Sequence, residues 1–289
     1  MALIDFHTHP WLPAHLNQAT SDFIRSISPA VATHGERLSD PAYAADVLRD
    51  QGVDRAVVLP EHCRETSGDV RTDTVLDHCA ARPDFYIPFA SVNPNLDDAP
   101  ADLLRRYIQR GARGLKLYPS YQFFHPDERR VYPIYQACLD AGIPLLLHIG
   151  SSVIPGTRVE FCDPARLAPV ARDFPDLPIV MAHGGRGHWY DECAALVRDH
   201  ENVYIDVTGL VPGRLLHLFP GLADMADRVV FGSDWPAMPK SVAHNVDVIR
   251  GLGLPDTALR AILGGNAQRL LRDQGPGSES ALRIGDAER

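Results

Sequence analysis

Eight short apolar runs separated by helical patterns constrain the fold of this chain more than any other feature of its sequence. Each run is rich in β-branched residues and ends in a turn or a polar cluster, as a buried strand does. The runs are Leu3–His9, Arg55–Pro60, Phe85–Val92, Gly114–Tyr118, Pro144–Ile149, Pro178–His183, Val203–Val207 and Val229–Ser233. Strands that alternate with helices form parallel sheets joined by crossover connections, so we expect an α/β fold.

Helical patterns lie between most of these runs. Ser39-Asp40-Pro41 opens the first of them, because a capping residue precedes a proline in the first turn. The others are predicted at Ala101–Arg110, Tyr132–Ala141, Asp163–Phe174, Tyr190–His200, Arg214–Ala226, Val242–Arg250 and Thr257–Leu271. Eight strand–helix units in about 270 residues match the usual size of a (β/α)8 TIM barrel. A doubly wound open sheet is the alternative, but the glycine-rich turn it needs after the first strand is replaced by His-Thr-His-Pro.

Two segments fall outside this alternation. Pro10–Leu38, which follows the first strand, is predicted to be a loop far longer than the usual connection from strand to helix. We predict that it covers an active site, with a surface excursion as the alternative. Residues 272–289 lose all periodicity and are predicted to be a flexible C-terminal tail. The barrel is therefore predicted as a single domain over residues 1–271.

Charge and cysteine content exclude several classes of protein. The 28 basic and 37 acidic residues give a net charge of −9, which disfavours a general nucleic-acid-binding surface. The sequence contains no run of about 18 apolar residues, the length needed to span a membrane, and the N-terminus has no signal-peptide pattern. The five cysteines are an odd number without a C-x-x-C pair, so neither a disulfide framework nor a cysteine zinc finger is expected. We therefore predict a cytoplasmic protein without nucleic-acid or membrane partners.

Five polar groups stand at the carboxyl ends of predicted strands, where barrel active sites lie. His7 and His9 are two residues apart, so their side chains point the same way in a strand. His148, His183 and Asp234 are each the first strongly polar or ionisable group after an apolar strand interior. A lone histidine at a strand end is more often structural, but the same placement repeats across four units. Imidazoles with one carboxylate suit Zn²⁺, with Mn²⁺ or Fe²⁺ as alternatives, so we predict a divalent metal site.

These motifs resemble those of the amidohydrolase superfamily. His-Thr-His near the start, His148, His183 and Gly-Ser-Asp-Trp-Pro near the end are similar to its amidohydrolase-related (amidohydrolase 2) branch. That branch includes aminocarboxymuconate semialdehyde decarboxylase and sugar lactonases. The resemblance runs from Leu3 to about Leu271, where Ile-Leu-Gly-Gly-Asn-Ala-Gln-Arg-Leu-Leu fits the closing helix. It implies a metal-dependent TIM-barrel hydrolase but identifies no substrate.

The resemblance also implies roles for the matching residues. His7, His9, His148 and Asp234 would be metal ligands, and His183 would bind a second metal or orient the water and the substrate. Asp234 would in addition take the proton from the water, so that Asp234 and His183 are the predicted catalytic residues. The chemistry agrees, because a divalent cation lowers the pKa of a bound water from 15.7 toward about 7. A neighbouring carboxylate can then carry the proton to the leaving group.

Lys116 lies in Gly-Leu-Lys-Leu-Tyr-Pro, a segment that resembles the dihydroorotase strand whose lysine is carbamylated and bridges two metals. Alternation along the strand turns Leu115 and Leu117 toward the helices and Lys116 toward the barrel interior. Lys116 is therefore a candidate metal ligand. An ion pair or an anchor for a substrate carboxylate is the alternative, and the number of metal ions, one or two, stays open.

The substrate and the reaction are less constrained. Arg64, Arg186 and Tyr118 are the predicted substrate-binding residues, since arginine suits bidentate recognition of a carboxylate. We expect a small-molecule substrate and hydrolysis of a C–N or C–O bond in an amide or a lactone. Non-oxidative decarboxylation of a small carboxylic acid is the alternative, and a non-catalytic barrel is a third. Barrels of this kind are often dimeric or larger, so a homo-oligomer is a further expectation from the resemblance.

Overall fold

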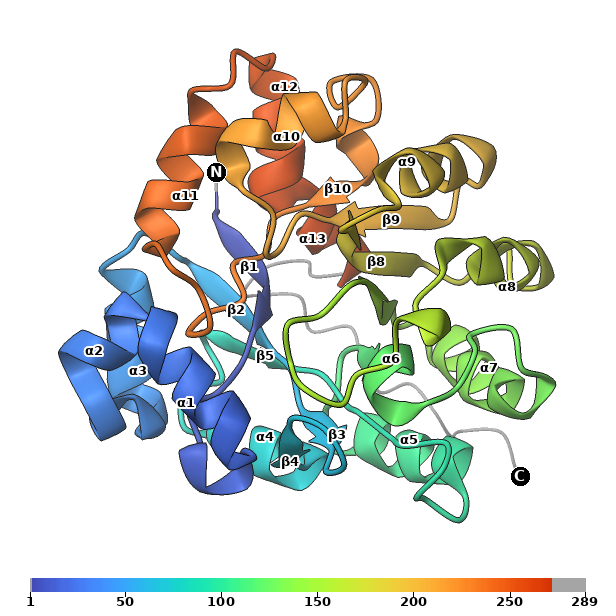
Figure 1. Ribbon diagram of the computed structural model, residues 1–289, viewed down its shortest axis with the longest axis horizontal. Helices are drawn as coiled ribbons and strands as arrows, with labels where there is room; N and C mark the ends of the chain where they lie inside the picture. The colour runs from blue at the N-terminus through green and yellow to red at the C-terminus, as the bar shows by residue number, and fades with distance from the viewer. Residues whose placement is uncertain (1, 272–289) are drawn as a thin grey trace, which may run out of the picture.

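A ring of parallel strands lies at the centre of the structure, a computed structural model that describes residues 2–271 (Figure 1). Within these residues the barrel strands are β1 (Ile4–Thr8), β2 (Arg55–Val58), β5 (Tyr86–Pro88), β6 (Leu115–Leu117), β7 (Leu145–Gly150), β8 (Ile179–Arg186), β9 (Val203–Asp206) and β10 (Val229–Val230). Each of the eight predicted strands is present, although β5 and β10 are shorter than the apolar runs that predicted them. The predicted (β/α)8 fold is confirmed.

The strands are hydrogen-bonded in two sheets, ordered β1-β2-β5 and β10-β9-β8-β7-β6, and all pairs in these two sheets are parallel. Backbone hydrogen bonds also join the two sheets at both edges. Next to β6, the Lys116 N–H donates to the Ala90 carbonyl at 2.8 Å. Next to β1, the Asp234 N–H donates to the His7 carbonyl at 2.9 Å. The beginning of the chain and the segment after β10 therefore lie side by side in the ring.

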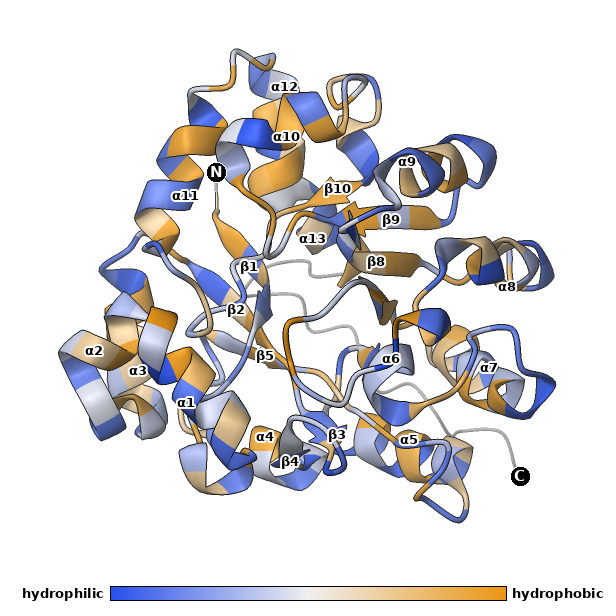
Figure 2. Ribbon diagram, in the orientation of Figure 1, coloured by the Kyte–Doolittle hydropathy of each residue, from blue (hydrophilic) through white to orange (hydrophobic). Residues whose placement is uncertain are grey.

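The strand side chains form two apolar layers, as alternation in a barrel requires. The inner layer fills the barrel with Ile4, Phe6, Val57, Leu59, Ile87, Phe89, Leu146, Val180, Ala182 and Val230. Leu115 and Leu117 instead pack in the larger cluster between strands and helices. Figure 2 shows the strands largely in orange and the outer helices with orange and blue alternating. Leu270, from the final helix, joins the inner layer at the amino ends of the strands, so the barrel interior is filled below the site.

The outer helices cover the ring. They are α3 (Pro41–Arg49), α4 (Thr72–Ala80), α5 (Pro100–Gln109), α7 (Tyr132–Ala141), α8 (Leu167–Asp173), α9 (Tyr190–Asp199), α10 (Leu215–Leu218), α11 (Val242–Arg250), α12 (Asp256–Arg260) and α13 (Asn266–Leu270), with α6 (Pro119–Gln122) after β6. The α3 helix begins as predicted, because the Asp40 side chain accepts hydrogen bonds from the N–H groups of Ala42 and Tyr43. A π-helical turn at Ala261–Gly265 joins α12 to α13.

Two helix predictions need correction. Arg214–Ala226 was expected to be one helix, but the structure has 3₁₀ turns at Pro212–Arg214 and Ala226–Arg228 around the short α10. Pro220 lacks an N–H and its ring clashes with a helical backbone, so a helix cannot continue through it. The α4 helix was not predicted. Its apolar positions are only Val75, Leu76, Cys79 and Ala80, so the helical spacing is present for little more than one turn.

The long connection after β1 is mostly helical rather than a loop. It holds a 3₁₀ turn at Pro13–His15, α1 (Gln18–Ile27), α2 (Pro29–His34) and a second 3₁₀ stretch at Gly35–Ser39. Pro29 follows Ser28, whose side chain accepts a hydrogen bond from the Val31 N–H, so α1 ends and α2 begins at this point. Figure 1 shows α1 and α2 on the side of the barrel where β1 ends.

An antiparallel hairpin, β3 (Glu61–Cys63) and β4 (Gly68–Val70), follows β2 and was not predicted. The chain entering α1 packs directly on it, and the Asn17 N–H donates to the Ser67 carbonyl at 2.9 Å. A Cβ at Gly68 would lie 2.5 Å from the carbonyl oxygen of His15, so only glycine permits this approach. The hairpin therefore holds α1 against the mouth of the barrel.

The remaining short elements are 3₁₀ turns at Arg129–Val131, Val159–Phe161 and Pro164–Arg166. None of the helices within residues 2–271 has the length and apolar character needed to cross a bilayer. The tail predicted for residues 272–289 lies outside the described residues.

Candidate metal centre

A cavity of about 420 Å³ opens at the carboxyl ends of the strands. All five polar groups singled out at strand ends line it: His7, His9, His148, His183 and Asp234. The long connection supplies part of its wall through Trp11, Phe23, Ile24 and Ile27, among others. The connection after β1 therefore borders the cavity, in agreement with its predicted role as a cover.

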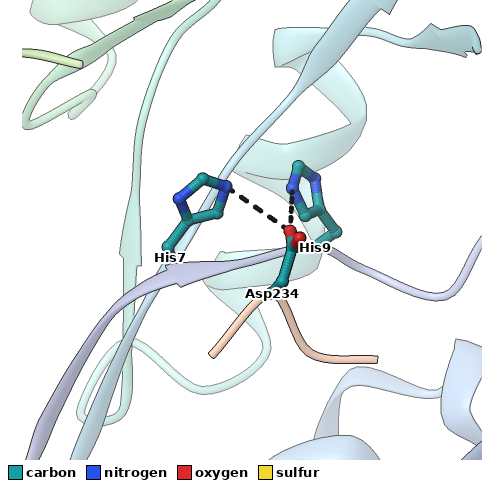
Figure 3. Close-up of side chains that lie close together, drawn as sticks. All are labelled: His7, His9 and Asp234. Atoms are coloured by element: carbon teal, nitrogen blue, oxygen red, sulfur yellow. Dashed lines mark ion pairs between the residues drawn. The ribbon is translucent and has the colours of Figure 1, made fainter. Parts of the chain in front are cut away.

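The closest group in the cavity consists of His7, His9 and Asp234 (Figure 3). The Nε2 atoms of His7 and His9 lie 3.6 and 3.5 Å from the same Asp234 oxygen, Oδ1. One nitrogen or oxygen of each residue lies within 4.8 Å of the other two. His7 is on β1, His9 follows directly after it, and Asp234 is in the segment after β10. The backbone hydrogen bond between Asp234 and His7 brings these segments together.

His148 and His183 stand beside this group. Their ring centroids are 4.4 Å apart, and the His183 ring lies 5.2 Å from that of His7. His183 Nδ1 is 3.0 Å from the Thr208 carbonyl, which leaves Nε2 as its free nitrogen. His148 Nε2 is buried without a hydrogen-bond partner in the described part of the chain. A buried nitrogen without a partner is rare and fits a position that binds a ligand.

Burial disfavours the charged form of three of the site histidines. It lowers the pKa of His7, His148 and His183 well below the ordinary value for imidazole. For Asp234, burial alone would raise the pKa, but the contact with His9 Nε2 at 3.5 Å and the positive charge of Arg186 are among the interactions that outweigh it. The pKa of Asp234 is therefore held below its usual range. Neutral imidazoles and an ionised carboxylate are the forms that bind a metal ion.

The two strand-end residues His183 and Asp234 adopt left-handed backbone conformations, with φ of 67° and 69°. This region is unfavourable for residues other than glycine, and such strain costs about 1–3 kcal/mol per residue. Aspartate tolerates it better than histidine, because its short side chain can hydrogen-bond locally. Strained residues cluster at functional sites, so their presence supports a functional role for this end of the barrel.

A second layer of side chains orients His7, and sequence reasoning missed it. Asp206, at the end of β9, places Oδ2 2.6 Å from His7 Nδ1, while its Oδ1 accepts hydrogen bonds from the Thr208 N–H and hydroxyl. The contact fixes Nε2 of His7 as the nitrogen directed toward Asp234. A Cβ at Gly232 would lie 2.1 Å from the Thr208 hydroxyl oxygen, so this network packs tightly. The available signal was that Asp206 is the only ionisable residue at the end of its apolar run.

We expect Asp206→Asn to weaken metal binding by about 10–100-fold, because outer carboxylates set the orientation and basicity of ligating histidines. A chelator-competition titration of the purified protein measures the metal dissociation constant. Asp199→Asn, an exposed carboxylate on α9, is the matched control and should bind metal as the wild type does. Equal affinities in the two variants would contradict the orienting role.

Lys116 is completely buried, as its inward position predicts. Its Nζ lies 4.8 Å from the centre of the Tyr118 ring and has no hydrogen-bond partner among the described residues. Burial lowers the pKa of Lys116 to about 8, although the charges of Asp206 and Asp234 oppose this shift. An amine in this position is uncommon as a purely structural feature, because a buried polar group is normally paired.

The predicted substrate-binding residues divide between the cavity and the surface. Arg186 lines the cavity and donates from Nε and Nη2 to the Ser151 carbonyl at 3.0 and 2.8 Å. Tyr118 also lines it, and its hydroxyl donates to the Pro60 carbonyl at 2.6 Å. Arg64 is instead exposed in the turn of the β3–β4 hairpin and does not line the cavity. The hairpin, which the sequence analysis did not anticipate, turns this arginine away.

Glu61, on β3, was not predicted but lines the cavity. Its Oε2 lies 3.9 Å from His9 Nδ1. In sequence it follows directly on the Arg55–Pro60 run, so it occupies the same kind of strand-end position as the predicted residues. The position of Glu61, as the first ionisable residue after the second apolar run, was thus a usable signal for a site residue.

Comparison with known proteins adds family information to this geometry. A family model described as "Amidohydrolase" matches residues 4–272. The dihydroorotase of Leptothrix cholodnii is 35% identical over 97 residues, which cover 30% of this chain and 28% of that protein. A dihydroorotase of Vibrio vulnificus is 28% identical over 163 residues, or 52% of this chain and 45% of that protein. These matches therefore span less than half the length of the dihydroorotases.

Solved structures share the whole barrel. A TIM-barrel protein from Bordetella bronchiseptica, described as uncharacterized, has a TM-score of 0.75 and 25% identity, covering 94% of this chain and 99% of that chain. A dihydroxybenzoic acid decarboxylase from Polaromonas, solved with manganese and the inhibitor 2-nitroresorcinol, has a TM-score of 0.69 and 17% identity, covering 94% and 97%. Likeness at this level of identity shows a common fold.

Proposed function

This chain belongs to the amidohydrolase family, and from that premise we propose that it hydrolyses a C–N or C–O bond, in an amide or a lactone, of a small molecule. The family consists of enzymes that use divalent metals. The observation that supports the proposal most is the convergence of His7, His9 and Asp234, whose donor atoms lie within 4.8 Å of one another at the cavity floor. An arrangement of two imidazoles and one carboxylate is suited to holding a cation.

The donor set fits a divalent metal ion. His7, His9 and Asp234 would hold it, and the unpartnered Nε2 of His148 and the free Nε2 of His183 are the additional nitrogens. Zn²⁺ is our first assignment, because it favours imidazole with a carboxylate. Mn²⁺ and Fe²⁺ are the alternatives, and manganese is bound in the Polaromonas decarboxylase. Such a cation lowers the pKa of a water toward about 7 and polarises a carbonyl.

The protein's own groups supply the remaining chemistry. The Asp234 carboxylate accepts the proton of the attacking water and passes it to the leaving nitrogen or oxygen. His183 directs its free nitrogen into the same space and orients the water or the substrate carbonyl. The surrounding wall is largely apolar, with Trp11, Phe23 and Ile24 on the side of the long connection. Excluding bulk water from the cavity strengthens every electrostatic interaction inside it.

Non-oxidative decarboxylation of a small carboxylic acid is the second candidate. One observation favours it, namely that the Arg186 guanidinium lines the same cavity as the histidines. Arginine is well shaped to pair with a carboxylate, and the cation would stabilise carbanion-like charge. Structures of decarboxylases that share this fold, such as the Polaromonas protein, make the alternative worth testing directly.

Removal of the metal is expected to abolish turnover, and Zn²⁺ or Mn²⁺ should restore it. The assay is a panel of small amides, lactones and carboxylic acids, run in ¹⁸O-labelled water with the released carbon dioxide measured. Incorporation of ¹⁸O into the product supports hydrolysis. Release of carbon dioxide with no ¹⁸O in the organic product would overturn the hydrolase assignment in favour of the decarboxylase. Less than about a tenth of a metal ion per chain, not raised by added Zn²⁺ or Mn²⁺, would indicate a non-catalytic barrel.

A further inference from the structure

A second cavity, of about 430 Å³, lies beside the one that contains the histidines. The two cavities have four lining residues in common: Gly209, Asp234, Ala237 and Pro239. Asp234, the proposed proton carrier, therefore forms part of the wall of both. The second cavity extends from there toward α11 and the segment after β9, and no residue of the connection that covers the first cavity lines it.

Away from Ser233 and Asp234, the second cavity has a largely apolar lining and one further group of polar residues. Its apolar lining includes Leu210, Val211, Leu215, Phe231, Met238 and Val248. Lys240, His244 and Asn245 also line it, where the chain enters α11. Their side chains form no hydrogen bond or ion pair with other residues in the described 2–271 range. Val211 is 61% exposed, so an apolar side chain stands uncovered at this cavity.

We propose that this cavity is a second substrate subsite, which takes an aliphatic chain ending in a carboxylate. The inference rests on the proposed function, since it places the reacting bond at Asp234, between the two cavities. The substrate's aliphatic chain packs against Leu210 and Phe231, and its removal from water supplies the affinity. The Lys240 ammonium, unpaired among the described residues, supplies the complementary charge for the terminal carboxylate. Substrates of this class have one part in each cavity.

Binding of aliphatic acids to the purified full-length protein tests the subsite without any turnover. Linear dicarboxylates with four to ten carbons are compared by calorimetry with monocarboxylates of equal length. We expect one length of dicarboxylate to bind about twofold to fivefold more tightly than its monocarboxylate, as an added ion pair with the exposed Lys240 ammonium would give. Lys240→Met should remove this difference, whereas Arg250→Met, an exposed cation at the other end of α11, should retain it.

A second variant tests the apolar part. Val248→Trp fills the cavity from the half-buried face of α11 and should weaken binding of the long acids while leaving acetate binding unchanged. Asp247→Trp, on the exposed face of the same helix, is the control for bulk and should bind them as the wild type does. Equal binding of mono- and dicarboxylates at every length, or long-acid binding unaffected by Val248→Trp, would overturn the subsite. Failure of the hydrolase assignment would instead appear only in the ¹⁸O assay.

Discussion

Asp234→Asn is expected to lower kcat/KM by about 10²–10⁴-fold, the usual contribution of a general base, while the barrel and most of the bound metal remain. The asparagine side chain has nearly the same shape but cannot accept a proton at neutral pH. The backbone at this position has φ of 69°, a left-handed conformation that asparagine also tolerates. Packing around the site should therefore survive the change.

The measurement is kcat/KM at matched metal content, with the fold checked by thermal unfolding. Asp224→Asn, an exposed carboxylate before the 3₁₀ turn at Ala226–Arg228, is the control and should be as active as the wild type. Activity of Asp234→Asn within about threefold of the wild type would show that Asp234 is not the base.

Replacing Lys116 decides how many metal ions the protein holds. Its amine is fully buried, has no hydrogen-bond partner among the described residues and is close enough to His7 and His148 to influence them electrostatically. If carbon dioxide converts the amine to a carbamate, the two carbamate oxygens can bridge a pair of cations. His7 and His9 would then serve one cation, and His148 and His183 the other. Lys116→Ala should accordingly lower the metal content from about two ions per chain toward one or none.

Short carboxylic acids should partly restore the metal content of Lys116→Ala, because they replace the missing carbamate. Lys116→Met, which keeps most of the side-chain volume, separates the loss of the amine from the effect of an empty space in the core. Elemental analysis of both variants gives the stoichiometry. If the wild type and both variants hold one ion while KM rises, the bridging role is wrong and Lys116 is an anchor for a substrate carboxylate.

The sequence predicted the strand ends well, because a buried parallel strand is an apolar run and its first polar residue marks its end. It did not predict how His7 comes to face the site. Ile4 and Phe6 lie in the inner layer, and strict alternation from them would turn His7 outward. The register of β1 against β2 shifts between Asp5 and Thr8, and this irregularity brings His7 to the inside. No single-sequence signal distinguishes such a shift from a regular strand.

Other features depended on contacts between distant segments. Asp206 stands at the end of its apolar run, but its contact with His7, 199 positions away in the chain, cannot be derived from the sequence, so its orienting role was missed. Arg64 was assigned to the site because it follows a strand, but the hairpin formed with β4 turns it outward. The α1 helix was predicted as part of a loop, because its large apolar residues, Phe23, Ile24 and Ile27, span little more than one helical turn.

The backbone hydrogen bond between Asp234 and His7 has a consequence for the lifetime of the folded protein. A cation held by His7, His9 and Asp234 would cross-link the first strand to the segment after the last, where the two sheets meet. Because only the folded chain presents these ligands together, free metal at about a thousand times its dissociation constant would stabilise the fold by about 4 kcal/mol. Scarcity of the ion would loosen this junction first and expose the chain to proteolysis. The supply of metal would thus govern the abundance of the protein as well as its activity.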